Sequence, residues 1–69
     1  MNVAEIGKLI IQRREFLNLR QEDLAEMSRV AIKTIHLIES GLGNPSVRTL
    51  EKIGTILGLE LLLQIKKVS

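Results

Sequence analysis

Residues 21–40 read QEDLAEMSRVAIKTIHLIES, which is two short helical patterns on either side of a brief break. In the first pattern the apolar and small side chains share one narrow face, and acids crowd its first two turns, where the helix dipole favours negative charge. The second pattern repeats isoleucine at helical spacing, and Leu42 continues its inward face. The segment therefore predicts a helix over 21–27, a break at 28–30 and a helix over about 31–39.

The flanking sequence predicts one more helix on each side. Upstream, Asn2 is a good N-cap with Glu5 three residues later, and apolar residues recur every three or four positions to about residue 17. Downstream, residues 41–45 form a Gly- and Pro-containing loop, Ser46 can cap a helix, and Gly58 can end it. We expect these four helices to form one domain over residues 1–58.

Two charged residues fall on faces that should point into the core. Arg14 lies on the apolar stripe of the first helix, and Glu39 lies on the inward face of the third. A guanidinium placed inside a protein needs an acidic partner or a path back to solvent. We therefore predict a structural Arg14–Glu39 ion pair.

The hydrophobic period changes after residue 58. Apolar and polar residues now alternate, with Leu62 as the exception, which is typical of a β-strand. The apolar positions of this predicted strand are Leu59, Leu61, Leu63 and Ile65. Because no other segment reads as a strand and a lone strand cannot satisfy its own backbone, we expect residues 59–69 to pair with a second copy of the chain.

Composition excludes several classes of protein. The 69 residues include no Cys and one His, so disulfides and thiolate metal sites are excluded, and no metal, cofactor or catalytic residue is expected. The hydrophobic content of 45% argues against disorder, while no apolar run approaches a membrane span of about 20 residues. The first residues lack a signal-peptide pattern, so we expect a cytoplasmic protein. A net charge of +2 permits nucleic-acid binding without demonstrating it.

Two short helices around a three-residue break, between two longer helices, form a helix-turn-helix candidate. From about Ile6 to Leu59 the sequence resembles the lambda-repressor/Cro (XRE) type of helix-turn-helix family. The matching residues are Leu19, Gln21, Glu22, Asp23, Leu24, Ala25, Val30, Ile35, Ile38, Glu39, Ser40, Gly41, Asn44, Pro45, Ser46 and Leu50. The resemblance implies a mainly α, four-helix, lambda-repressor-like domain that binds double-stranded DNA, and it also implies the Arg14–Glu39 pair. The sequence departs from the family pattern at Arg20, Arg29 and Ala31, where a cap, a turn glycine and a second cap are usual.

The end of the chain narrows the resemblance. Most relatives continue into a fifth helix, whereas here Gly58 leads into Leu-Glu-Leu, which is similar to HipB-type antitoxins. This similarity implies a homodimeric transcriptional repressor that binds an inverted-repeat operator. It further implies that the protein is the autoregulating antitoxin of a toxin–antitoxin pair and that its partner is a HipA-like kinase. The expected location is the nucleoid, in a bacterial or phage context. The alternatives are a phage- or plasmid-type XRE repressor without a toxin, and a protein-interaction module that has lost DNA binding.

The candidate site residues lie on the two central helices and the loop that follows them. Expected base contacts in the major groove come from Ile32, Lys33, Thr34, His36 and Leu37. Expected phosphate contacts come from Arg20, Gln21, Asn44, Ser46 and Arg48. Simpler roles are also open for these residues. The first set can be an ordinary solvated helix face, and Gln21 can simply begin its helix. Ile32 and Leu37 can either pack on thymine methyl groups or complete the core.

Overall fold

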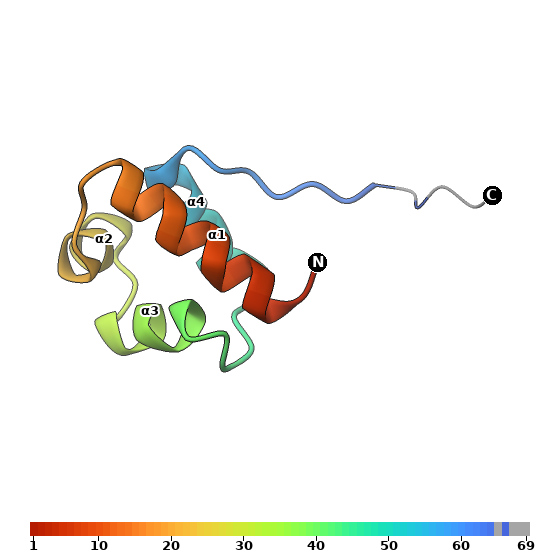
Figure 1. Cartoon of the computed structure of the whole chain (residues 1–69), viewed down its shortest axis with the longest axis horizontal. Helices are drawn as coiled ribbons and strands as arrows, with labels where there is room; N and C mark the ends of the chain where they lie inside the picture. Colours follow the sequence, from red (N-terminus) through yellow and green to blue (C-terminus); the bar gives the residue numbers. More distant parts are fainter. Residues whose placement is uncertain (65, 67–69) are drawn as a thin grey trace.

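A computed structural model describes residues 1–64 and 66 of the chain. Its four helices are α1 (Val3–Phe16), α2 (Gln21–Ser28), α3 (Ile32–Glu39) and α4 (Val47–Leu57). Figure 1 shows α1 running across the molecule, with α2 and α3 below it and α4 behind. The prediction of a mainly α, four-helix, helix-turn-helix fold is confirmed. Each predicted helix end lies within one or two residues of the observed one.

Local chemistry explains where the helices begin and end. The side chain of Asn2 accepts a hydrogen bond from the backbone N–H of Glu5 (2.9 Å), and Ser46 Oγ accepts one from the N–H of Thr49 (3.1 Å). The left-handed conformation of Gly58 (φ 72°) ends α4. Arg29 ends α2 in the same conformation (φ 59°), which costs a residue with a Cβ on the order of 1 kcal/mol.

The core is a small aliphatic cluster to which all four helices contribute. Its buried members are Ile10, Leu24, Val30, Ile35, Ile38, Ile53 and Leu57. Helix α1 crosses α3 at Gly7, where an added Cβ would collide with the carbonyl oxygen of Ile38. This close approach brings the inward sides of α1 and α3 together and so sets the position of α3.

Three apolar residues that the helical pattern placed on core-facing stripes are exposed. Leu42 was expected to continue the inward face of α3, but the chain turns at Gly41 (φ 74°) and leaves Leu42 60% exposed. Val47 and Leu17 stand at helix ends, beyond the reach of the neighbouring helices, and are 66% and 38% exposed. The periodicity was right within the helices and wrong at their ends.

The predicted C-terminal strand, which was expected to pair with a second copy, is not supported by the single chain, since no β-strand occurs within residues 1–64 and 66. After Leu59 N–H donates to the carbonyl oxygen of Gly54 (2.9 Å), the tail leaves the helical body as the drawn-out segment at the right of Figure 1. A strand forms only against another extended segment, and the described part of this chain offers none. Ile65, the last apolar position of the predicted strand, lies outside the described residues, as do residues 67–69.

An apolar groove of about 570 Å³ lies between α1, α4 and the start of the tail. Its apolar lining includes Ile6, Leu9, Leu50 and Leu61. Leu62, which also lines the groove, is 69% exposed, and the next residue, Leu63, is fully exposed. None of the described helices is long and apolar enough to cross a bilayer.

Candidate nucleic-acid interface

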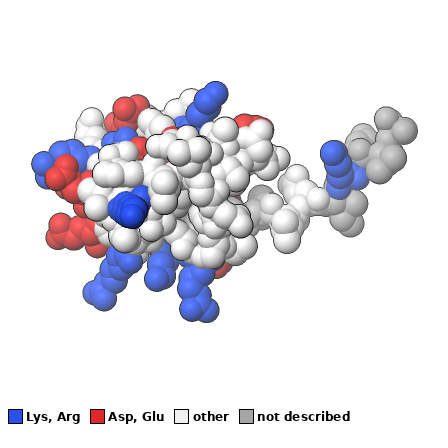
Figure 2. All heavy atoms as spheres, turned by 90° about the horizontal axis from the view of Figure 1, so that it is seen from below, with Lys and Arg blue, Asp and Glu red and all other residues white. Residues whose placement is uncertain are grey.

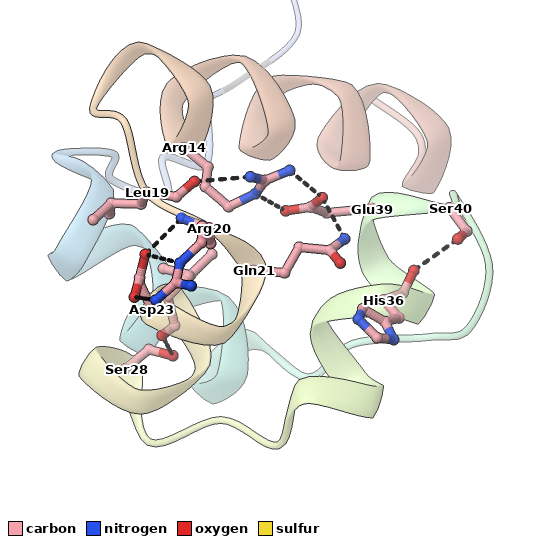
Figure 3. Close-up of polar contacts among 10 residues, drawn as sticks. Arg14, Leu19, Arg20, Gln21, Asp23, Ser28, His36, Glu39 and Ser40 are labelled. Atoms are coloured by element: carbon pink, nitrogen blue, oxygen red, sulfur yellow. Dashed lines mark hydrogen bonds and ion pairs between the residues drawn. The ribbon is translucent and has the colours of Figure 1, made fainter.

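A network of polar side chains fixes the two central helices against α1. Arg14 Nε and Nη2 donate to the two carboxylate oxygens of Glu39 (2.7 and 2.9 Å), and Arg14 Nη1 donates to the carbonyl oxygen of Leu19 (2.9 Å). Gln21 Nε2, from the first residue of α2, donates to Glu39 Oε1 (2.9 Å). Figure 3 shows these groups converging between α1 and α3. The Arg14–Glu39 ion pair expected from the sequence is present, and Gln21 joins α2 to it.

The ion pair is largely shielded from solvent. The side chains of Arg14 and Glu39 are only 13% and 5% exposed. The hydrogen bond to the carboxylate of Glu39 raises the pKa of the Arg14 guanidinium above its ordinary value. The carboxylate belongs to the last residue of α3, and the two residues that donate to it belong to α1 and α2. The network therefore fixes the orientation of α3 relative to these two helices.

The candidate base-contacting residues lie on the outward side of α3. Lys33 and His36 are exposed, Ile32 and Leu37 are 41% and 42% exposed, and Thr34 is half-buried. Ile32 and Leu37 therefore do not complete the core. Figure 3 shows the His36 ring apart from the ion-pair network, and the bond that Ser40 makes to this residue uses its backbone carbonyl.

The candidate phosphate-contacting residues have different surroundings. Ser46 is engaged in capping α4, and the Gln21 side chain is held by Glu39. Asn44 and Arg48 are exposed, and among the described residues no hydrogen bond from either side chain is seen. Asn44 adjoins the outward side of α3, because it lines a hollow of about 170 Å³ together with Thr34 and Leu37. Leu42, which was expected in the core, lines the same hollow.

The guanidinium of Arg20 forms an ion pair with Asp23 of the same chain. The backbone N–H of this arginine donates to Asp23 Oδ2 (2.8 Å), and its guanidinium reaches both oxygens of the same carboxylate (3.2 Å each). An arginine side chain cannot accept the hydrogen bond that a Ser or Thr side chain would accept at this N-cap position. The Asp23 carboxylate instead accepts a hydrogen bond from the backbone N–H of Arg20. These bonds hold the pKa of Asp23 below its ordinary value. Apart from the i, i+3 spacing, no pattern in the sequence indicated this pair.

Removing the Asp23 carboxylate should make helix stability less dependent on pH. A carboxyl group whose pKa is lowered on folding stabilises the fold above its ordinary pKa of 3.8, and this contribution disappears as the pH falls through the folded-state pKa. We therefore expect Asp23→Ala to lower Tm at pH 7, with the difference from the parent shrinking below pH 3.8. Thermal unfolding followed by circular dichroism measures it, with Glu22→Ala as the exposed control. A Tm difference that stays constant from pH 7 to pH 2 would contradict this role.

Charge is distributed unevenly over the surface. Between residues 28 and 50 the only acid is Glu39, which is enclosed by Arg14, while Arg29, Lys33 and Arg48 are all exposed. Figure 2, seen from the α3 side, shows mainly uncharged atoms in front, basic groups along the lower edge and acidic groups at the end where α2 lies. Within the described residues no three His, Asp or Glu side chains gather as a metal site requires. This surface suits a polyanion better than a cation.

Comparison with known proteins agrees with this geometry. A family model described as helix-turn-helix matches residues 10–64. Over 56 residues, which are 81% of the chain, the sequence is 41% identical to a protein of Methanococcus vannielii that is provisionally named an HTH-type transcriptional regulatory protein. The chain corresponds to 17% of the length of that relative. Residues 10–64, which the family model matches, include α2, α3 and α4 in full.

Proposed function

We propose, from the premise that this chain belongs to the XRE-type helix-turn-helix family, that it binds double-stranded DNA by sequence and regulates transcription. The observation that carries the proposal is the outward side of α3, which is exposed, bordered by basic residues and fixed from behind by the Arg14–Glu39–Gln21 network. A helix presented in this way can enter the major groove. The name of the archaeal relative, an HTH-type regulatory protein, supports the same function.

In the proposed complex the two sets of residues have separate tasks. Base edges are met by the exposed residues of α3, namely Ile32, Lys33, Thr34, His36 and Leu37. Phosphates are met by Arg20, Gln21, Asn44, Ser46 and Arg48, which contribute side-chain donors and, at the first turns of α2 and α4, backbone N–H groups. Phosphate contacts supply most of the affinity and base contacts supply the choice of sequence.

Salt dependence tests DNA binding directly. We expect the affinity for a random duplex to fall as salt rises, because each neutralised phosphate releases counterions. Arg48→Ala should weaken binding to all duplexes alike and reduce the log–log slope by about 1. Fluorescence anisotropy of a labelled duplex measures both, and Lys8→Ala, which removes an exposed cation of α1, is the matched control. Absence of salt-dependent binding favours instead the protein-interaction module, for which the exposed Ile32 and Leu37 are the specific support.

We further propose that the chain acts as a homodimer on an inverted-repeat operator. Exposed leucines on the tail and the apolar groove beside it support this, since paired tails and filled grooves would remove that surface from water. Two copies related by a two-fold axis would place two α3 helices in successive major grooves, with half-sites about 34 Å apart or a multiple of that distance. A strand, which is not seen within residues 1–64 and 66, would then form between two tails.

The dimer proposal predicts the effect of shortening the tail. Deleting residues 61–69 should yield a monomer, because the leucines that pair the two copies are gone. Sedimentation equilibrium measures the mass, and the substitution Gln64→Ser, which keeps those leucines, is the control. A shortened chain that sediments as the same dimer as the parent would overturn the role of the tail.

We propose as the specific role an autoregulating antitoxin that represses its own operon and binds a HipA-like kinase. The support is the leucine-rich tail, which follows α4 directly and resembles the tail of HipB-type antitoxins. Co-expression with a HipA-like kinase tests it: a stable complex that neutralises the kinase is expected. No complex, together with intact DNA binding, would favour a phage- or plasmid-type repressor.

A further inference from the structure

The outward side of α3 offers little hydrogen bonding to a base edge. The side chains that read guanine and adenine through paired hydrogen bonds are chiefly Arg, Lys, Asn and Gln, and α3, with the sequence IKTIHLIE, has only Lys33 among them. Its one acid, Glu39, is taken up by Arg14 and Gln21. Lys33, Thr34 and His36 are the polar groups that remain on this helix for direct readout.

Apolar surface occupies much of the same side. Ile32 and Leu37 are each about two-fifths exposed, and Leu42, just beyond α3, is 60% exposed. Leu37 and Leu42 line the hollow beside Thr34 and Asn44. The hollow is small, about 170 Å³, which is room for a methyl group or one aliphatic side chain and too little for a whole helix of another protein.

The charges around this apolar surface indicate what covers it. Arg29, Lys33 and Arg48 lie before, within and after it in the chain, and between residues 28 and 50 the only acid is the enclosed Glu39. Basic residues around an apolar strip complement the major groove of DNA, where phosphates border the edges of the bases. The one apolar group that a base presents there is the 5-methyl group of thymine.

We propose that Ile32 and Leu37 contact thymine methyl groups from α3 and so add sequence selectivity to the polar contacts of the same helix. The proposal rests on the proposed function and specifies the bases that the site contains. Burying one methyl group against aliphatic carbon changes affinity by about fourfold. The selected half-site should accordingly contain thymines at two or more positions that face α3, with Lys33 as the main polar reader between them.

Replacement of thymine by deoxyuridine, which removes only the methyl group, tests the proposal. Duplexes bound by the full chain are first selected from a random pool, and each thymine of the half-site is then replaced in turn. We expect Kd by fluorescence anisotropy to rise about fourfold at each contacted position and to stay unchanged for a thymine outside the half-site. In Leu37→Ala or Ile32→Ala, the fourfold rise in Kd on deoxyuridine replacement should disappear at one of the contacted positions. The Tm of each variant checks that it is folded.

The outcomes separate the inference from the proposed function. If the chain prefers its selected sequence but every deoxyuridine duplex binds as tightly as the parent duplex, thymine readout is wrong and DNA binding stands. If selection enriches no sequence and binding to duplexes is absent, the proposed function itself fails. The deoxyuridine series on the parent protein needs no variant, so its result does not depend on how a substitution folds.

Discussion

Glu39→Ala is expected to lower the free energy of unfolding by about 3–5 kcal/mol, because it leaves the guanidinium of Arg14 shielded from water without its partner. The Glu39 side chain is 5% exposed and accepts three hydrogen bonds, two from Arg14 and one from Gln21. For a domain of this size such a loss is a large part of the total stability. Urea unfolding followed by circular dichroism at 222 nm gives the value.

Two further variants make this result specific. Glu26→Ala removes an exposed acid of α2 and should change stability by less than about 0.5 kcal/mol. Glu39→Gln keeps one acceptor oxygen and should fall between the parent and the alanine variant. A loss below about 1 kcal/mol for Glu39→Ala would mean that the pair does not hold α1 and α2 against α3.

The double substitution Lys33→Ala with Thr34→Ala should remove most of the sequence preference while leaving the fold intact. Each base contact contributes roughly 1–3 kcal/mol of discrimination, so the ratio of affinities for a selected over a scrambled duplex should fall at least about 30-fold. Lys33 is exposed and Thr34 half-buried, and neither belongs to the buried core. Gel-shift titration with both duplexes measures the ratio.

The matched control for the double variant lies on α4. Lys52→Ala with Thr55→Ala removes the same two side-chain types from exposed positions and should leave the preference unchanged. A Lys33/Thr34 variant that still prefers the selected duplex by the parent ratio would refute the assignment of base contacts to Lys33 and Thr34.

Features encoded locally were predicted well from the sequence. Asn2, Ser46 and Gly58 act within one helical turn of their own position, so residue type and spacing were enough to place helix ends. The Arg14–Glu39 contact spans 25 residues, yet it was predictable because each residue violated an otherwise apolar stripe. A charge that does not fit its face is a signal for a partner elsewhere.

Features that depend on the path of the chain were predicted poorly. The pattern placed Leu42 in the core because it continued the periodicity of α3, but Gly41 changes the chain direction one residue earlier. The engagement of Gln21 with Glu39 needed the positions of two helices, and its residue type alone also suited a phosphate contact. Residues 59–64 have a strand period, but the described part of the chain offers no neighbouring strand, so alternation alone did not produce a strand there.

The central claim is that α3 contacts DNA, and nuclear magnetic resonance of the full chain with a selected duplex measures this residue by residue. We predict that the largest changes in backbone amide shifts on binding occur over residues 31–37, with smaller changes at Gln21 and over residues 44–48. Changes confined to the groove between α1 and α4 and to the tail, with α3 unaffected, would contradict the claim.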